Sequence, residues 1–380
     1  MRRKILIVSS EFPPGPGGIG HHAYSLAKEL LKIEEVQLKV LCNADYVDAE
    51  KIQGFDRDAK FQIVRFKRIG KLTQIVRLIQ YLSVCLQMKP EVIIYTGLFS
   101  LWLMNLPVLG QRVKKVAIMH GHEPIFGSRF NQWLTIYSFK KAHSFIAVSR
   151  FSMSTLLSKY KLDKHQHVEI IPNGIDPDYL RSWQNLIREN DIALKLKTGF
   201  PRLLTIGHTS PRKGQHNVIN ALPEIKKNHP EVIYYIVGRD VRNGELLALA
   251  KKLGVLDHIQ FIPPTVEHFQ LLKFYQQADI FILLSENQPN GDVEGFGIVA
   301  LESNYFGVPV IGSKGCGVED AVQEGFSGYL VENKDVHEIS NRVNDILSNS
   351  DLFATNAKEF AKRYQWDHII KQYELLLCVE

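Results

Sequence analysis

The segment VEGFGIVALE carries two acidic residues, Glu294 and Glu302, on either side of two glycines in an otherwise apolar run. Free backbone N–H groups at the start of a helix bind phosphate, and carboxylates accept hydrogen bonds from sugar hydroxyls. The segment could therefore bind a ligand that contains both a phosphate and a sugar. Spacing alone leaves a structural alternative open, in which Glu294 stabilises the helix dipole and Glu302 forms a salt bridge along the helix.

The same segment predicts where its helix lies. Gly297 favours a helix start around Phe296–Ile298, and Gly307 favours its end. Glu294 then precedes the first turn, beside N–H groups that have no partner within the helix. Glu302 lies about one and a half turns further along.

A second candidate phosphate site is the glycine loop GPGGIG at residues 15–20, between a predicted strand and a predicted helix. It matches the dinucleotide pattern G-x-G-x-x-G, and Gly17 and Gly18 leave room for a phosphate beside the backbone. In the dinucleotide fingerprint the first glycine lies in the tight turn that leaves the strand, whereas SEFPP intervenes here. The loop either contacts a phosphate or is a flexible turn without a ligand, and its spacing disfavours an NAD-dependent oxidoreductase.

Short apolar runs that alternate with helical patterns must position these residues. The runs are KILIVSS, QLKVLCN, EVIIYTG, KVAIMHG, SFIAVS and VEIIPNG in the first half, and RLLTIGH, VIYYIVG, IQFIP, IFILLS, PVIGS and GYLV in the second. Strands rich in Val and Ile between helices predict parallel sheets covered on both faces. The fold class is therefore α/β, with two doubly wound Rossmann-like domains at residues 1–185 and 195–363. Ligands of such domains bind beyond the carboxyl ends of the strands.

The composition fits a globular protein and excludes few functions. The chain has 380 residues, 45% of them hydrophobic and 23% charged, with a net charge of +6 that suits an anionic ligand or membrane surface. Its four cysteines are far apart, which favours reduced thiols in a cytoplasmic protein. The uncharged stretch from Val92 to Gln111 is interrupted by Gly97 and Pro107, so a buried strand is favoured over a membrane span.

The ordered series of motifs resembles the retaining glycosyltransferases of family 4, which have the GT-B fold of two Rossmann-like domains facing across a cleft. The motifs are GGIGHHAYSLAKEL, HGHE, AVSRFS, IPNGID, PRKGQ, IVGRD, EGFGIVALESNYFGVPVIG and GVEDAVQEGFSGYLV. The resemblance extends over nearly the whole chain. It implies transfer of a hexosyl residue from a UDP- or GDP-sugar, in a cleft between an N-terminal acceptor-side domain and a C-terminal donor domain. A final helix, at residues 364–380, would pack back on the first domain.

The resemblance also implies roles for individual residues. The acids form its E-x7-E motif: Glu294 would contact the donor sugar and Glu302 the ribose of the nucleotide. The amides of Phe296, Gly297 and Ile298 would hold the donor diphosphate. His120 would lie at the sugar end of the site and Gly18 near the diphosphate.

A lysine of the family clamps the phosphates, and Lys213 matches it. Many members have an arginine where this chain has His208. If His208 is neutral, Lys213 counters the phosphate charge alone unless Arg212 reaches the site. The structural alternative for Arg212 and Lys213 is a solvated turn, and for His120 a satisfied histidine at a strand end.

No metal or other cofactor is expected. Asp176 and Asp178 resemble a metal-binding D-x-D pair, but they follow a turn in which Asp is an ordinary cap residue. Amides and Lys213 can stabilise a departing diphosphate without a metal. We therefore predict metal-independent transfer.

The prediction for the acceptor side rests on the segment RFKRIGKLTQIVRLIQYL. Arg65, Lys67, Arg68, Lys71 and Arg77 surround a helical apolar stripe of Leu72, Ile75, Val76, Ile79 and Leu82. A basic amphipathic segment suits an anionic bilayer and a lipid-linked acceptor, as in the synthesis of surface polysaccharides or glycolipids. The protein would then be cytoplasmic and peripheral on the inner face of the membrane. The alternative is a core helix with a solvated basic edge.

Other functions remain open alongside the transferase. A nucleotide-sugar epimerase shares the fold but needs no acceptor. A non-catalytic protein that binds sugar nucleotides or membranes is also possible, because His208 in place of an arginine would weaken binding of the diphosphate. Nucleic-acid binding is disfavoured because the basic segment lacks interleaved aromatics for base stacking.

Overall fold

The structure, a computed structural model, describes residues 3–15, 17–33, 35–44, 48–67, 69–108, 113–182, 196–262 and 270–378. The chain divides into two compact units, Met1–Gly174 with Trp366–Glu380, and Ile175–Gln365. The division falls earlier than residue 185, where the sequence predicted the end of the first domain. The predicted linker at 186–194 lies outside the described residues.

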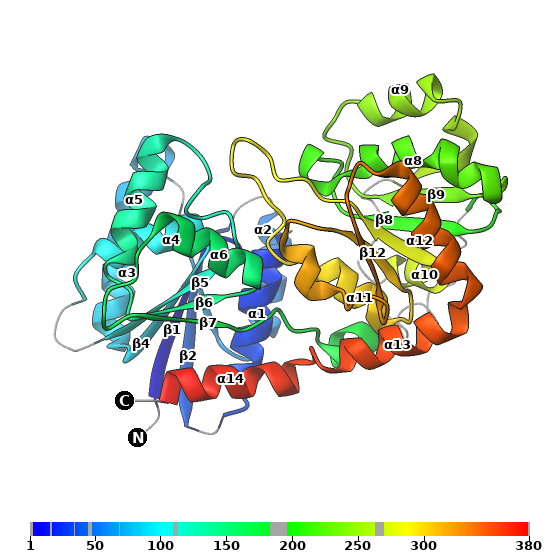
Figure 1. Cartoon of the computed structure of the whole chain (residues 1–380). Helices are drawn as coiled ribbons and strands as arrows, with labels where there is room; N and C mark the ends of the chain where they lie inside the picture. The colour runs from blue at the N-terminus through cyan, green and yellow to red at the C-terminus, as the bar shows by residue number, and fades with distance from the viewer. Residues whose placement is uncertain are drawn as a thin grey trace. The chain divides into compact units, whose positions relative to one another are not determined.

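The first unit contains a parallel seven-stranded sheet in the order β3-β2-β1-β4-β5-β6-β7 (Figure 1). Its strands are β1 (Arg3–Ser9), β2 (Val36–Cys42), β3 (Gln62–Arg65), β4 (Val92–Thr96), β5 (Lys114–Met119), β6 (Ser144–Ala147) and β7 (His167–Ile170). Its helices are α1 (Gly18–Leu30), α2 (Ala49–Asp58), α3 (Thr73–Met88), α4 (Leu98–Trp102), α5 (Arg129–Phe139), α6 (Arg150–Lys159) and α14 (Trp366–Cys378). The order reverses between β1 and β4, as in doubly wound folds.

The C-terminal helix α14 packs against α1 within the first unit. The hydroxyl of Tyr373 is 3.0 Å from Nε2 of His22, a buried residue of α1. The ring of Trp366 fills the space beside Gly174, where a methyl group would overlap it. The last residues of the chain therefore complete the core of the unit that contains the first strand.

The second unit contains a parallel six-stranded sheet in the order β10-β9-β8-β11-β12-β13. Its strands are β8 (Arg202–Ile206), β9 (Ile233–Val237), β10 (Ile259–Ile262), β11 (Ile280–Leu283), β12 (Val310–Ser313) and β13 (Gly328–Val331). Its helices are α8 (Gln215–Asn228), α9 (Glu245–Lys252), α10 (Leu271–Gln277), α11 (Ile298–Tyr305), α12 (Val336–Ser348) and α13 (Ser350–Lys362). Short 3-10 helices include η3 (Pro211–Lys213) and η6 (Gly317–Ala321). The predicted helix after Gly297 is confirmed as α11.

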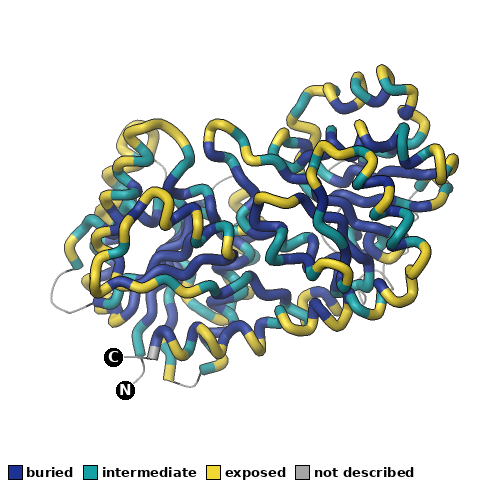
Figure 2. Tube along the Cα trace, in the orientation of Figure 1, coloured by how far each residue is buried: buried dark blue, intermediate teal, exposed yellow. Residues whose placement is uncertain are grey.

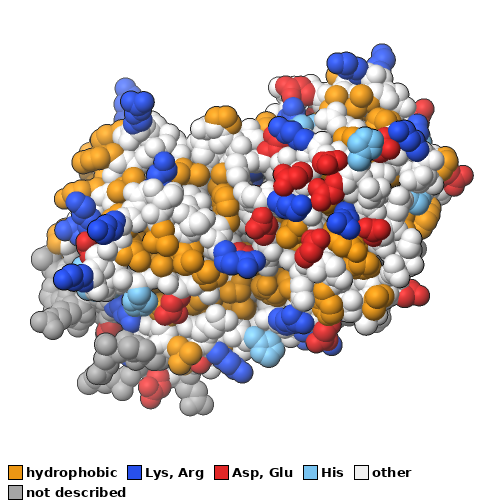
Figure 3. Space-filling view, in the orientation of Figure 1, with side chains coloured by type: hydrophobic (Ala, Val, Ile, Leu, Met, Phe, Trp, Pro, Cys, Tyr) orange, Lys and Arg blue, Asp and Glu red, His pale blue; other side chains and the backbone are white. Residues whose placement is uncertain are grey.

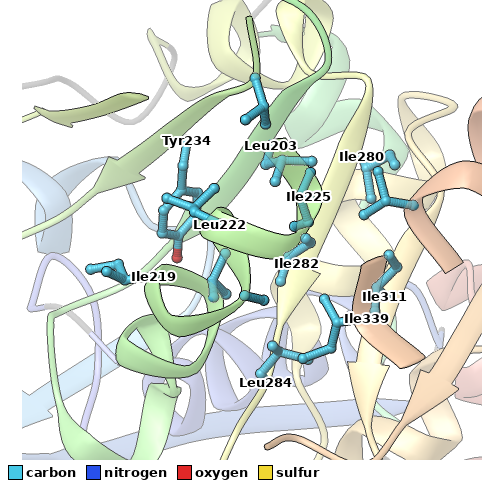
Figure 4. Packing of buried hydrophobic residues seen from close by; sticks show 14 of the residues in the cluster. Leu203, Ile219, Leu222, Ile225, Tyr234, Ile280, Ile282, Leu284, Ile311 and Ile339 are labelled. Carbon is cyan, nitrogen blue, oxygen red and sulfur yellow. The ribbon is translucent and has the colours of Figure 1, made fainter. Parts of the chain in front are cut away.

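The central strands of both sheets are buried, as expected for parallel strands covered by helices on both faces (Figure 2). In the second unit, Ile219, Leu222 and Ile225 of α8 pack with the aliphatic side chains of β8, β9 and β11 (Figure 4). The buried Tyr234 hydroxyl donates to Thr205 Oγ1 at 2.9 Å, which satisfies a polar group inside this core.

The strand order fixes where a ligand can bind in each unit. It reverses between β8 and β11, so the loops after these strands diverge on opposite faces of the sheet and leave a crevice at its carboxyl edge. His208, Arg212 and Lys213 follow β8, and Glu294 follows β11. The second sheet therefore brings together residues that are far apart in the sequence.

Within the described residues, no helix is both long enough and apolar enough to cross a membrane. The uncharged stretch that begins at Val92 contains the fully buried strand β4, which ends at Thr96 and is followed by Gly97 with a φ of 83°.

The backbone at Gly214 gives a stability prediction. Gly214 has a φ of 69°, and an added methyl group would overlap the carbonyl oxygen of Leu284. Gly254 has a φ of 66° but open space around it. We expect Gly254→Ala to lower the free energy of unfolding by about 1 kcal/mol and Gly214→Ala by about 3 kcal/mol or more, since only the second adds a clash to the backbone strain. Urea unfolding followed by circular dichroism measures both, and equal losses would contradict the close packing at Gly214.

Candidate active site

An ion cluster lies where the loops after β8 and β11 meet in the second unit. Lys213 Nζ is 2.7 Å from Glu294 Oε2, and the Arg212 guanidinium pairs with the same oxygen. Arg212 Nε is also 2.9 Å from Asp292 Oδ1. The side chain of Glu294 is only 11% exposed, so two cations surround a nearly buried carboxylate.

These contacts decide the charge of Glu294. Burial alone would raise the pKa of its carboxyl, but Arg212 and Lys213 outweigh this effect and lower the pKa to about 2. Burial lowers the pKa of Lys213, and Glu294 opposes that effect. The pKa of Arg212 is raised, chiefly by Glu294. Glu294 is therefore an ionised hydrogen-bond acceptor at neutral pH.

The turn between Glu294 and α11 is held against η6. Gly317 N donates to Glu294 O at 2.8 Å, and a methyl group at Gly317 would overlap the carbonyl of Gly295. Gly297 caps α11 with a φ of 84°. The first N–H groups of a helix have no carbonyl partner within it, so this turn presents donors next to the cation cluster. Such a combination suits an anion such as a diphosphate.

Glu302 lies on α11 in a different environment from Glu294. Its Oε2 accepts a hydrogen bond from the hydroxyl of Tyr275 on α10 at 2.9 Å. Burial raises the pKa of Glu302 to about 7, against the opposing effects of Tyr275 and Lys213. The two acids of the segment are therefore an ionised carboxylate and a carboxyl that titrates near neutrality.

His208 does not add a positive charge to the cluster. It is exposed beyond the end of β8, but protein atoms still shield part of its ring from solvent. This partial desolvation, together with the charges of Arg239, Lys213 and Arg212, lowers its pKa. At neutral pH it is a polar group without charge. The positive charge near Glu294 comes from Arg212 and Lys213.

His120 follows β5 in the first unit and is held from both sides. Its Nε2 is 2.8 Å from Thr96 Oγ1, and its backbone N–H donates to the fully buried carboxylate of Glu123 at 2.8 Å. The ring of His22 contacts it edge to face, with centroids 5.3 Å apart. Burial, His22 and His122 lower the pKa of His120 well below its usual value. The imidazole is therefore neutral and fixed in orientation.

The glycine loop is shaped by Glu11. Gly17 caps α1 with a φ of 135°, and a methyl group there would overlap the Glu11 carboxylate. Gly18 begins the helix and has open space around it. The loop is therefore open beside Gly18, whereas the Glu11 side chain fills the space beside Gly17.

The predicted basic face is partly wrong. Arg65 lies in β3 and its side chain is 12% exposed, because it pairs with Asp56 at 2.7 Å and donates to Asn43 O. Arg77 is 7% exposed and stacks over Phe99 and Phe66. The structure shows Lys67 and Lys71 to be exposed, and Arg68 lies outside the described residues.

Asp176 and Asp178 act as turn residues. The Asp176 carboxylate accepts the backbone N–H groups of Asp178 and Tyr179 at 3.0 and 3.1 Å. Asp178 pairs with Arg181 at 2.6 Å. The Asp176 carboxylate thus has the turn role that the sequence pattern predicted, whereas the ion pair of Asp178 with Arg181 was not predicted.

Several residues of these sites were missed by sequence reasoning. They are Asp292, Glu123, Tyr275 and His22. Glu123 stands three residues after His120 in the motif HGHE, so a carboxylate that turns back on the strand end could have been anticipated. The contact between Tyr275 and Glu302 joins two helices and leaves no local signal.

Two family models together span nearly the whole chain. The model described as Glycosyltransferase Family 4 matches residues 16–179, and the model described as Glycosyl transferases group 1 matches residues 187–364. The chain belongs to glycosyltransferase family 4. For this family 4 glycosyltransferase, the predicted activity class is also confirmed: it is a glycosyltransferase that depends on a nucleotide sugar.

Curated relatives match this glycosyltransferase along most of their length. A GDP-mannose-dependent monoacylated alpha-(1-6)-phosphatidylinositol monomannoside mannosyltransferase of Corynebacterium glutamicum is 26% identical, over 91% of this chain and 89% of the relative. A GDP-mannose-dependent alpha-(1-6)-phosphatidylinositol monomannoside mannosyltransferase of Mycolicibacterium smegmatis is also 26% identical, over 90% and 89%.

Solved structures confirm the GT-B fold of this glycosyltransferase. HepE of Anabaena in complex with UDP-glucose has a TM-score of 0.77 at 20% identity, covering 99% of this chain and 100% of that one. Sucrose-phosphate synthase of Thermosynechococcus elongatus has a TM-score of 0.77 at 17% identity, covering 99% and 98%.

The titration of Glu302 gives a prediction. The native state keeps this proton up to about pH 7, whereas the unfolded chain loses it near about pH 4.3. The unfolded state binds fewer protons in this window, so the free energy of unfolding falls as the pH rises through it. We expect the stability of the wild type relative to Glu302→Gln to fall by about 2 kcal/mol between pH 5 and pH 8. Parallel pH profiles of urea unfolding for the two proteins would contradict the raised pKa.

Proposed function

We propose that this enzyme transfers mannose from GDP-mannose to a lipid-linked acceptor, with retention of the anomeric configuration. The observation that carries the donor part is the Glu294 cluster, in which an ionised carboxylate and two cations adjoin the free N–H groups at the start of α11. A nucleotide sugar needs both kinds of group, since its diphosphate is an anion and its hydroxyls are donors.

The donor diphosphate would be held by the amides of Phe296, Gly297 and Ile298 and by the cations Lys213 and Arg212. His208 would contribute a neutral hydrogen bond at most, because its pKa is lowered. Charge on the departing diphosphate grows in the transition state, so fixed donors at this place favour the reaction without a metal. Arg212 thus supplies the second charge that an arginine at position 208 would have given.

The sugar and ribose contacts follow from the two acids. Glu294, ionised and held by Arg212, would accept hydrogen bonds from hydroxyls of the transferred sugar. Glu302 would accept from the ribose, with Tyr275 holding one of its oxygens. We also propose the roles that the resemblance implies for His120, at the sugar, and for Gly18, near the diphosphate; Gly17, its neighbour in the glycine loop, would lie on the same side of the donor.

The relatives support the choice of donor and acceptor. Two that match about nine-tenths of the chain are named for GDP-mannose and for phosphatidylinositol mannosides. A lipid-linked acceptor would place the enzyme at the cytoplasmic face of a membrane as a peripheral protein. A nucleotide-sugar epimerase remains the second candidate on fold alone.

Incorporation of radioactive mannose tests the proposal. The enzyme is incubated with GDP-[¹⁴C]mannose, bacterial lipid extract and excess EDTA, and label is counted in the organic phase. We expect label with GDP-mannose, less than a tenth as much with UDP-glucose or UDP-N-acetylglucosamine, and no loss in EDTA. Label only from a UDP-sugar would change the donor. Conversion of the sugar without release of nucleoside diphosphate would favour the epimerase, and activity only after addition of Mg²⁺ would contradict metal independence.

The variant Lys213→Ala tests whether Lys213 binds the diphosphate rather than another part of the nucleotide. A hydrogen bond to a charged group contributes about 1.5–3 kcal/mol, so the affinity for GDP should fall about 10- to 100-fold. GMP lacks the second phosphate, and we expect its affinity to change by less than about threefold. Titration calorimetry measures both ligands, with Lys252→Ala on the exposed end of α9 as the control. Equal losses for GDP and GMP would place Lys213 away from the second phosphate.

A further inference from the structure

The first unit has a long stretch almost without acidic residues. Between residues 59 and 162 the only acids are Glu91 and Glu123, against 16 lysines and arginines. Glu123 is fully buried and holds the backbone at His120. Among the described residues of this stretch, ten lysines and arginines are exposed but only one acid, Glu91, although the net charge of the whole chain is only +6.

An aromatic row runs along the outer face of α5. Phe130, Trp133 and Tyr137 follow one another at helical spacing and are 66%, 58% and 43% exposed. Trp133 stacks on Tyr137 with centroids 5.7 Å apart, and Phe130 adjoins Trp133 at 5.9 Å. Arg129 and Lys140 at the ends of the row are exposed. Large aromatic side chains seldom gather on a surface that has no partner.

The outer face of α3 and the turn before it is also apolar. Its exposed side chains are Leu72, Ile75, Ile79 and Leu86, each more than half exposed. The helix points this face outwards because Arg77, on the opposite face, is buried against Phe66 and Phe99. Lys71 is exposed beside the apolar residues.

The two faces flank α4. Arg77 of α3 stacks over Phe99 of α4, at 5.1 Å from the ring centroid. On the other side, Trp102 Nε1 of α4 donates to Thr135 Oγ1 of α5 at 2.9 Å. Figure 3 shows hydrophobic and basic side chains next to one another at the left of the view, where Figure 1 draws α3 and α5.

We propose that the outer faces of α3 and α5 form a docking surface for an anionic lipid bilayer. Charge decides the occupant: apolar and aromatic side chains among lysines and arginines, without exposed acids, complement a negatively charged membrane. Trp and Tyr are the side chains that prefer the interface between headgroups and acyl chains. The surface would bring the enzyme to the membrane that contains its lipid-linked acceptor, so its purpose rests on the proposed function.

Vesicle binding tests the surface without any sugar donor. Wild-type enzyme is sedimented with vesicles of phosphatidylcholine alone or with 30% phosphatidylglycerol at 0.1 M salt. We expect at least tenfold stronger binding to the anionic vesicles, and at least a tenfold loss in the double variant Phe130→Ser/Trp133→Ser. Leu352→Ser is the matched control, since Leu352 on α13 of the second unit is 58% exposed and should have no effect. Unchanged thermal stabilisation by GDP would show that the variants fold.

Fluorescence locates the contact on α5. Brominated lipids quench a tryptophan that enters the bilayer, so quenching should occur in the wild type and be lost in Trp133→Phe, which keeps an aromatic ring for binding.

Three results would overturn the proposal: no vesicle binding by the wild type, equal binding by the double variant, or a wild-type dimer in analytical ultracentrifugation that the double variant dissociates. The last would assign the surface to a second copy of the chain. Vesicle binding without mannose transfer would contradict the proposed function alone.

Discussion

The pairing of Glu294 with Arg212 and Lys213 is the interaction on which the candidate site depends. A carboxylate that is nearly buried is costly unless opposite charges compensate it, and two cations next to each other repel without an acid between them. Each member of the cluster therefore needs the others. Because the cations follow β8 and the acid follows β11, the cluster also ties together the loops on the two sides of the point where the strand order reverses.

Close backbone packing makes this arrangement stiff. Gly214 lies against the carbonyl of Leu284, and Gly317 lies against that of Gly295. The first contact joins the end of η3 to the end of β11, and the second joins η6 to the turn before α11. Any side chain at these two glycines would separate the loops. Backbone packing thus fixes the positions of Lys213 and Glu294 independently of the attraction between their charges.

The sequence was sufficient for most of the fold. All twelve apolar runs form strands, since parallel strands buried on both faces have a strong local pattern. It missed β3 (Gln62–Arg65), a short edge strand that is not fully buried and whose apolar run consists only of Ile63 and Val64. At the site, the pattern around Glu294 was visible because turn glycines and a helix start are local signals. The partners Asp292, Tyr275 and His22 were not, because their contacts depend on how separate elements pack.

The segment with α3 shows why a periodic pattern does not fix which face of a helix is buried. The stripe of Leu72, Ile75 and Ile79 had the spacing of a core face, and Arg77 had that of a solvated edge. The structure reverses the two, because Phe66 and Phe99 offer aromatic faces to the guanidinium and the cation is stabilised there. Turning this arginine inwards leaves the apolar stripe in water, which costs free energy in an isolated protein. A partner that covers the stripe would remove this unfavourable exposure to water. The burial of Arg77 therefore leaves exposed the apolar surface that we propose binds the membrane.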